Sequence, residues 1–213
     1  MRVRVYVDGF NLYYRALKRT PYKWLNVVEL AKSLLQPDDT VDMVRYFTAR
    51  ISPRAGNPDA PKHQQLYLSA LGTLPEIDIH YGRFLPKDKW RPIAHPTWTP
   101  DVMVQVRDTE EKGSDVNLAV HMLNDGHHDR YDVALLLSQD TDLCEPMRMI
   151  QESGKIVGLV CLDGREPNKR LKRHASFVRH VTAARLAAAQ FPDQLVGTKG
   201  QEITKPGEWV VEP

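Results

Sequence analysis

Four aspartates lie where the sequence predicts that a strand ends or a helix begins. Asp8 and the pair Asp140 and Asp142 each follow an apolar run, and Asp115 precedes a run of helical character. In an open α/β sheet, the carboxyl ends of parallel strands line one crevice, where ligands bind. Carboxylates that converge there oppose each other's ionisation unless a cation compensates them. An all-oxygen acidic cluster suits Mg²⁺ or Mn²⁺, so the pattern predicts a metal site.

Each of these positions also has a purely structural interpretation. Asp8 or Asn11 could cap the helix that follows, and Asp142 is a good cap for the next one. Asp115 in the first turn of a helix would be stabilised by the helix dipole. Lys112 is placed either to pair with Asp115 or to contact a phosphate. Jointly, three acidic positions far apart in the chain are harder to explain as caps than any one of them.

The composition is that of an ordinary globular protein. The chain has 213 residues, of which 42% are hydrophobic and 26% charged, and its length suits one well-buried domain. The net charge is +2, so any affinity for nucleic acid must come from local patches. No apolar run approaches the ~20 residues of a membrane span, and the first residues do not resemble a signal peptide. The two cysteines form neither a metal motif nor a disulfide framework. We therefore expect a cytoplasmic protein without a membrane segment.

Short β-rich runs alternate with helix-length amphipathic segments, the pattern of βαβ units around a parallel sheet. The predicted strands are 2–7, 41–51, 77–84, 102–106, 131–137, 156–161 and 178–181, and the predicted helices are 12–18, 27–35, 59–71, 115–123, 143–153, 171–177 and 183–190. The run 131–137 is apolar, which favours a central strand. Residues 87–100 contain three prolines and are predicted to form an irregular loop. The final stretch is predicted to be an extended tail that either folds back to bury Trp209 or frays.

The densest positive segment follows the predicted strand 156–161 and includes Lys169, Arg170, Lys172 and Arg173. A solvated helix face accounts for most runs of this kind. In a parallel sheet, however, this segment would lie at the same edge as the acidic residues, where phosphate contacts position a polyanion without reading its bases. Bases stack on aromatic side chains, although core packing explains any single aromatic residue equally well. The aromatic residues considered for stacking are Tyr13, Tyr14, Trp90 and Trp98.

Several other chemistries lack their sequence signatures. The turn after Asp8 contains one glycine, Gly9, instead of the G-x-G-x-x-G of dinucleotide-binding folds. No nicotinamide or flavin cofactor is therefore expected. The histidines lack the paired spacing of a zinc site, and none is predicted to be a ligand or a base. The sequence contains no nucleophile elbow, Walker motif or H-E-x-x-H.

Three short blocks resemble the signature blocks of the NYN domain, a family of the PIN-like superfamily. They are VYVDGFNL at 5–12, EKGSDV at 111–116 and SQDTDL at 138–143. The blocks are specific as a set and weak singly. The resemblance covers nearly the whole chain, and residues 190–192 and 205–209 resemble the end of the bacterial DUF88-type branch. It implies a three-layer α/β/α, Rossmann-like (PIN-like) fold with a mainly parallel sheet over residues 1–192, followed by the tail 193–213.

The resemblance also implies a metal-dependent ribonuclease. Asp8, Asp115 and Asp140 would be the catalytic, metal-binding acids, with Asp142 auxiliary and Asn11 orienting the site. The implied cofactor is Mg²⁺ or Mn²⁺, which would assist hydrolysis of phosphodiester bonds. The expected partner is RNA, in single-stranded form.

The resemblance also assigns basic residues to contacts with RNA. Lys112 would contact a substrate phosphate, and the segment containing Lys169, Arg170, Lys172 and Arg173 would follow the RNA backbone. Because related folds host unrelated functions, two other functions stay open. One is a catalytically inactive RNA- or nucleotide-binding regulator. The other, an oxidoreductase on a Rossmann-like fold, is disfavoured by the missing glycine fingerprint. The oligomeric state stays open.

Overall fold

The structure is a computed structural model that describes residues 1–53, 56–93 and 102–209. In this part of the chain, six strands form a central sheet in the order β3-β2-β1-β6-β7-β8, and every neighbouring pair is parallel. The strands are β1 (Arg2–Asp8), β2 (Thr40–Thr48), β3 (Ile77–Tyr81), β6 (Val133–Leu137), β7 (Ile156–Cys161) and β8 (Phe177–His180). This confirms the predicted α/β class and its parallel sheet.

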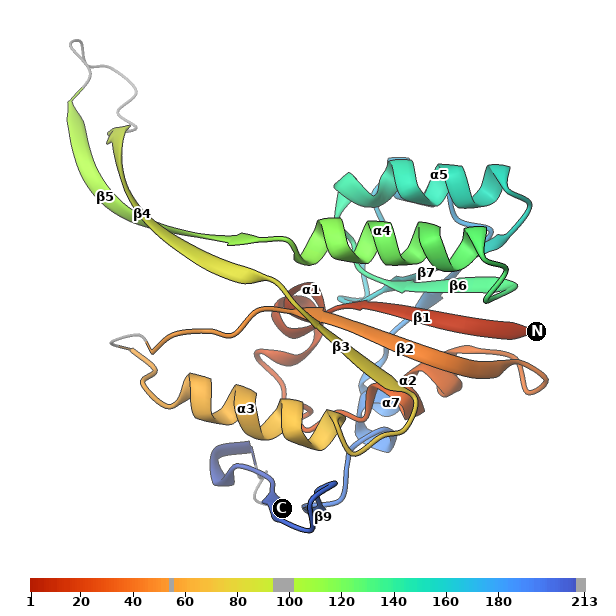
Figure 1. Cartoon of the computed structure of the whole chain (residues 1–213), viewed down its shortest axis with the longest axis horizontal. Coiled ribbons are helices and arrows are strands. Elements are labelled where there is room, and N and C mark those ends of the chain that lie inside the picture. Colours follow the sequence, from red (N-terminus) through yellow and green to blue (C-terminus); the bar gives the residue numbers. More distant parts are fainter. Residues whose placement is uncertain (54–55, 94–101, 210–213) are drawn as a thin grey trace.

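Helices cover both faces of the sheet (Figure 1). On one face lie α2 (Val27–Leu34), α3 (Ala60–Leu71) and α7 (Ala183–Ala188), and on the other lie α4 (Ser114–His127), α5 (Cys144–Glu152) and the short α6 (Lys169–Arg173). Side chains alternate along β1, so Val5 and Val7 join the first core and Tyr6 joins the second. All five residues of β6 are buried because it is central and covered on both faces. The architecture is the three-layer α/β/α fold that was expected.

The sheet reverses its direction of growth between β1 and β6. From β1 the chain moves outward to β2 and β3, whereas from β6 it moves the other way to β7 and β8. Ligands of doubly wound folds bind outside the carboxyl ends of the strands at such a switch point. Asp8 is the last residue of β1, and Asp140 follows the end of β6. The fold therefore brings two of the predicted acids to this position.

A tight turn follows β1. It begins with α1 (Gly9–Leu12), which continues into a π-helical turn, η1 (Tyr13–Leu17). A Cβ atom on Gly9 would lie 2.8 Å from the ring of Tyr46, closer than packed atoms allow. The glycine of this turn therefore lets the chain pass close to Tyr46, a different use from the cradling of a pyrophosphate.

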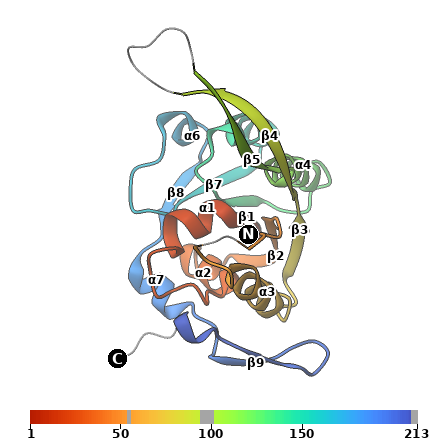
Figure 2. The same ribbon diagram turned by 90° about the vertical axis from the view of Figure 1, so that its left-hand side faces the viewer.

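The region predicted to be a loop differs from the structure. Strands β4 (Arg83–Pro92) and β5 (Met103–Lys112) pair antiparallel and form an arm that extends away from the sheet (Figures 1 and 2). The predicted loop 87–100 is therefore wrong for residues 87–92, and the predicted strand 102–106 is longer and lies in this arm. A two-stranded ribbon has two free edges, where proline is tolerated. Residues 94–101, including Trp98, lie outside the described residues.

Other predicted boundaries also differ from the structure. The predicted strand 77–84 is divided at Gly82 into β3 and the start of β4. The predicted helix 171–177 ends at Arg173 as α6, and the chain enters β8 at Phe177. Within the described residues, no helix is both long and apolar enough to cross a membrane.

The chain after residue 193 folds back onto the body of the protein. It forms an antiparallel pair, β9 (Gln194–Val196) and β10 (Glu202–Thr204), and a 3₁₀ turn, η3 (Gly207–Trp209). Ile203 is 3% exposed within the first core, and the ring of Trp209 lies 6.2 Å from that of Trp24. Of the two predicted alternatives for this segment, the structure has the one in which Trp209 folds back. The division of the chain at residue 192 stays a prediction.

Candidate functional site

Three of the predicted acids line one cavity at the switch point of the sheet. The cavity has a volume of about 630 Å³, and Asp8, Asp115 and Asp140 all contribute to its wall. They come from the end of β1, the first turn of α4 and the segment after β6. Glu111, at the end of β5, lines the same cavity. Four acidic side chains from four separate elements therefore share this space.

Asp8 is held from two sides. Its Oδ1 accepts a hydrogen bond from the backbone N–H of Asn11 at 2.9 Å, so it does cap the following helix. Its Oδ2 accepts a hydrogen bond from the Ser138 hydroxyl at 3.1 Å. The side chain is 5% exposed, and burial raises its pKa, an effect that these hydrogen bonds oppose and the nearby Asp140 carboxylate reinforces. The capping interpretation and the site interpretation of Asp8 are thus compatible.

The segment after β6 is tied to its neighbours by side-chain amides and a hydroxyl. The Asn11 side-chain oxygen accepts a hydrogen bond from the Gln139 backbone N–H at 3.1 Å. The Gln139 side-chain oxygen in turn accepts one from the Leu162 N–H at 2.9 Å, which links the segments after β6 and β7. The Ser138 hydroxyl oxygen also accepts from the Asp140 N–H at 3.2 Å. Asn11 therefore holds the backbone next to Asp140, and its predicted role in orienting the site stays a prediction.

The turn before α4 places Asp115 and a second acid beside each other. Gly113 has a φ of 104°, a left-handed conformation that favours glycine. The backbone N–H of Ser114 donates to Oε1 of Glu111 at 3.2 Å, so Glu111 satisfies one free donor at the start of the helix. Asp115 then falls in the first turn of α4. The sequence block EKGSDV is thus a turn that presents two carboxylates to the cavity.

The acids of the cavity oppose each other's ionisation. The pKa of Asp115 is raised to about 6, first by burial and then by the negative charges of Asp8, Asp140 and Glu111, with a smaller contribution from Asp142. Like charges at short range favour the protonated form of one member of such a group. A bound cation would remove this repulsion.

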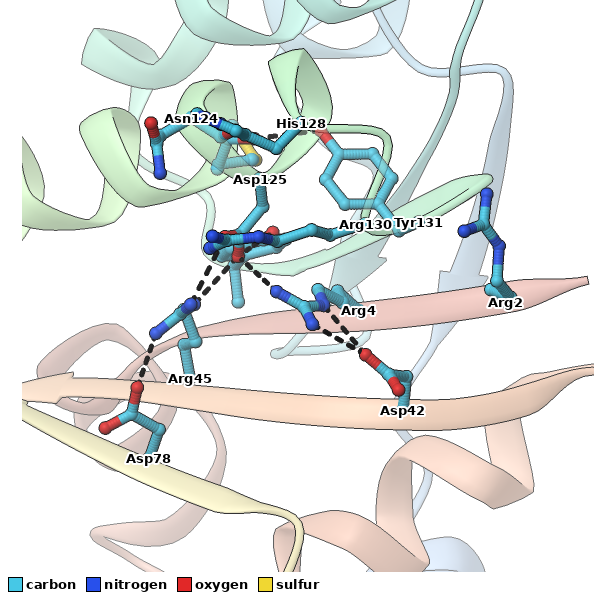
Figure 3. A network of polar contacts seen from close by, with 12 residues as sticks. Arg2, Arg4, Asp42, Arg45, Asp78, Asn124, Asp125, His128, Arg130 and Tyr131 are labelled. Atoms are coloured by element: carbon cyan, nitrogen blue, oxygen red, sulfur yellow. Dashed lines mark hydrogen bonds and ion pairs between the residues drawn. The ribbon is translucent and has the colours of Figure 1, made fainter.

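Helix α4 is fixed to the sheet by a buried ion network at its other end (Figure 3). Asp125 is 0% exposed and accepts hydrogen bonds from Arg45 at 2.8 Å and from the Tyr6 hydroxyl at 2.9 Å. Arg4 and Arg130 also pair with it, at 3.1 and 3.0 Å. Burial alone would raise the pKa of Asp125, but its bonded cations and Tyr6 outweigh burial and lower it. The network anchors the helix that carries Asp115.

Asp142 and Lys112 lie outside the wall of the cavity that contains the three acids. Asp142 is exposed and lines neither of the two cavities at this edge, while its N–H donates to Oδ1 of Asp140 at 2.9 Å. Lys112 pairs with Glu110 at 3.0 Å, not with Asp115, and its side chain is half exposed. Both residues therefore lie next to the acids without joining them on the cavity wall.

The positive segment borders a second, smaller cavity of about 400 Å³. This cavity shares Asp140 with the first and is also lined by Arg165 and Asn168. The four cations of the predicted RNA track are exposed on and around α6, and Lys172 pairs with Glu166 at 2.8 Å. None of these four residues, Lys169, Arg170, Lys172 and Arg173, lines either of the two described cavities.

The chemical types of the side chains on the cavity wall suit a divalent cation. Hard cations prefer carboxylate and other oxygen ligands, and Asp8, Asp115 and Asp140 supply carboxylates to one cavity. Ser114, on the same wall, is 3% exposed, and its hydroxyl has no hydrogen-bond partner within the described part of the chain. In residues 1–53, 56–93 and 102–209, however, no group of three or more His, Cys, Asp or Glu side chains is arranged to hold a metal ion. The donor types fit, whereas a closed set of ligands is not preformed.

Sequence reasoning missed several residues of this site. Ser138 and Ser114 occur inside the quoted blocks, but nothing in a serine's neighbours shows that its hydroxyl will be buried. Glu111 was likewise part of a block without an assigned role. The position of each just before or after a predicted acid was the available signal.

Comparisons with known proteins agree with this architecture. The model of the NYN domain family matches residues 2–181. A solved structure of a Vibrio parahaemolyticus protein of unknown function superposes with a TM-score of 0.53 at 17% identity, covering 85% of this chain and 93% of that one. At this identity the likeness concerns the fold alone.

A curated relative is named as an oxygenase, not as a nuclease. It is a 6-hydroxy-3-succinoylpyridine 3-monooxygenase, HspA, from Pseudomonas putida (strain DSM 28022 / S16). The two sequences are 31% identical over 243 residues, which covers 100% of this chain and 77% of the relative. The name describes that protein's reaction.

Proposed function

Because the chain belongs to the NYN domain family, we propose that it is a metal-dependent ribonuclease that hydrolyses phosphodiester bonds in single-stranded RNA. Family membership suggests a nuclease-like fold and RNA binding. The observation that carries the finer proposal is the shared cavity of Asp8, Asp115 and Asp140 at the switch point of the sheet. These residues would hold Mg²⁺ or Mn²⁺, with Asp142 as an auxiliary acid.

The cation would lower the pKa of a bound water and stabilise the negative charge that develops on the phosphate. The protein's own residues would position the reactants. Asp8 is fixed by Asn11 and Ser138, so its carboxylate need not reorganise.

Proton movement in this scheme involves Asp115. Its pKa of about 6 means that it is protonated in a fraction of molecules near neutral pH when no cation is bound. Binding of a cation would favour its ionised form, because an opposite charge nearby lowers a carboxyl pKa. No side-chain nucleophile is required, since water is the attacking group.

The direct test is RNA cleavage by the purified chain. A fluorescently labelled, unstructured RNA is incubated with the protein in Mg²⁺ or Mn²⁺ and in EDTA. We expect metal-dependent cleavage that is lost in EDTA and restored by excess metal. Binding of the RNA without cleavage in either ion would favour the inactive RNA-binding regulator.

A second candidate function is oxidation of a small heteroaromatic acid. It is favoured by the match between all of this sequence and 77% of the Pseudomonas putida protein named as a monooxygenase. Incubation with 6-hydroxy-3-succinoylpyridine under air and with an added two-electron donor such as NADH, followed by mass spectrometry, tests it directly. The donor is needed because a monooxygenase reduces the second oxygen atom of O2 to water. A product with one added oxygen, formed by a chain that leaves RNA intact, would replace the ribonuclease proposal.

A further inference from the structure

The cavity that contains the acids extends well beyond them. Its wall also includes Tyr13 and Tyr14 of η1, Tyr67 of α3, and Trp209 of η3. A volume of about 630 Å³ falls within the range of pockets that bind small organic molecules. The acids occupy one part of a larger cavity.

A chain of ring contacts connects the acids to the C-terminal segment. The charge of Asp8 acts on the Tyr46 hydroxyl and, after burial, contributes to raising its pKa. The Tyr46 ring lies 6.3 Å from that of Tyr67, which in turn lies 6.5 Å from that of Trp209. The aromatic part of the cavity is therefore two ring contacts from Tyr46.

Trp209 packs against three aromatic rings and also lines the cavity. It meets Trp24, Tyr67 and His63 at interplanar angles of 61°, 66° and 64°. At these angles none of the three stacks flat on its ring. The residue lies in η3, beyond the family match at residues 2–181, so the C-terminal segment supplies this part of the cavity wall.

Two lysines line the same cavity. Lys18 lies 4.9 Å from the centre of the Tyr14 ring, and Lys23 follows η1. Neither forms an ion pair with a carboxylate among the described residues. Positive charges beside aromatic rings, with acids at the other part of the cavity, suit a ligand that joins a planar ring to a phosphate.

We infer that the part of the cavity lined by Tyr14 and Trp209 is a subsite for one nucleobase. It would bind the base of the nucleotide whose phosphate lies at Asp8, Asp115 and Asp140, and Lys18 and Lys23 would face the adjoining phosphate. The inference rests on the proposed ribonuclease function, which it deepens by assigning substrate recognition to the C-terminal segment. The aromatic wall reads the presence of a base, because every base has a flat face that can stack.

The test compares adenosine 5′-monophosphate with ribose 5-phosphate, which lacks the base. Both are titrated calorimetrically into the full chain in Ca²⁺ buffer. Stacking on an aromatic side chain predicts that the nucleotide binds at least about 10-fold more tightly. Trp209→Leu should remove most of this ratio. Trp90→Leu is the matched control, because Trp90 is 63% exposed on the arm and outside the cavity, and it should leave the ratio unchanged.

A second variant covers the case in which Trp209→Leu fails to fold. Tyr14 is 55% exposed, so Tyr14→Ala should fold normally and lower the ratio several-fold. Lys23→Gln should weaken both ligands equally and preserve the ratio. Equal affinities of the parent for the two ligands, or a ratio unaffected by both aromatic substitutions, would overturn the subsite.

Two further measurements separate this inference from the proposed function. Base-dependent binding that persists in a chain that never cleaves RNA would support the subsite and reject the ribonuclease. RNA cleavage without any base-dependent binding would do the reverse. A free pyridine bearing a carboxylate side chain that binds more tightly than the nucleotide would overturn the assignment to a nucleotide, because the ring would then come from a small molecule.

Discussion

The Ser138 hydroxyl donates a hydrogen bond to Oδ2 of Asp8 at 3.1 Å, and this contact joins the ends of β6 and β1. The same oxygen accepts from the Asp140 N–H at 3.2 Å. One buried hydroxyl therefore fixes a carboxylate of the first strand and the backbone of another acid. The distance between Asp8 and Asp140 is set at this point of the sheet.

Ser138→Ala should weaken this link. Asp8 would lose one partner of a buried carboxylate, and leaving such a group without its hydrogen bond costs about 1–3 kcal/mol. Urea denaturation should show a loss of unfolding free energy in that range. Thr198→Ala removes a hydroxyl at an exposed turn position and should change stability by less than about 0.5 kcal/mol. Equal effects of the two substitutions would contradict the role of Ser138.

Asp140→Asn separates catalysis from capping. Asn keeps the shape and is as good a helix cap as Asp, but it removes the charge that a divalent ion needs. Metal-dependent RNA cleavage should fall by roughly 100-fold or more, a range typical for loss of one electrostatic contact to a transition state, while circular dichroism stays unchanged. Asp38→Asn, at an exposed position outside both cavities, is the matched control. Retained cleavage by Asp140→Asn would reject the catalytic assignment.

Asp115 makes stability and activity depend on pH. Its pKa in the folded chain is about 6, above the ~3.9 of an unfolded aspartate. Its contribution to stability is therefore fully present below about pH 4 and is lost as the pH rises through 6. Asp115→Asn should raise the melting temperature at pH 7.5 by on the order of 2–4 °C and leave it unchanged at pH 4.

Added Mg²⁺ tests whether Asp115 binds the cation. The cation should stabilise the parent at pH 7.5 by binding the folded state, and it should stabilise Asp115→Asn much less. At subsaturating Mg²⁺, cleavage by the parent should rise with pH through about 6, because protonation of Asp115 then competes with binding of the cation. A melting temperature of Asp115→Asn below that of the parent at pH 7.5 would show that Asp115 is a structural cap.

Asp125, on the same helix, should behave in the opposite way. Its pKa is lowered in the folded chain, since its bonds to Arg45 and Tyr6 outweigh burial. Its stabilisation is present at neutral pH and is lost as the pH falls below about 4 toward the lowered folded pKa. Asp125→Asn should cost about 3–5 kcal/mol at pH 7, because it removes a fully buried charge on which three arginines converge. The buried Arg45 would keep the more exposed Asp78 as its charge partner. Urea denaturation at pH 7 and pH 3 measures both the loss and its decrease in acid.

The positive segment should supply salt-sensitive affinity for RNA. Replacing Lys169, Arg170, Lys172 and Arg173 together with glutamine should weaken binding and flatten its dependence on salt, because fewer counterions are released. Fluorescence anisotropy with a labelled single strand at several salt concentrations measures this slope. Identical slopes for the variant and the parent would identify the segment as a solvated face.

The local sequence determined where strands end and helices begin around the acids. The apolar run before Asp140 is β6, and β7 spans the predicted residues 156–161. The block EKGSDV leads into α4 with Asp115 in its first turn. These features are predictable because alternation, apolar runs and capping residues act between neighbours in the chain.

Only the tertiary structure decided which of these ends meet, and what else meets there. The order of strands places β1 beside β6, which brings Ser138 to Asp8 across 130 residues of sequence. It also brings Trp209 to the cavity and turns residues that were predicted to be a proline-rich loop into one strand of an arm. Such contacts depend on burial and on free strand edges, which no local pattern encodes, because they exist only once distant segments have packed together.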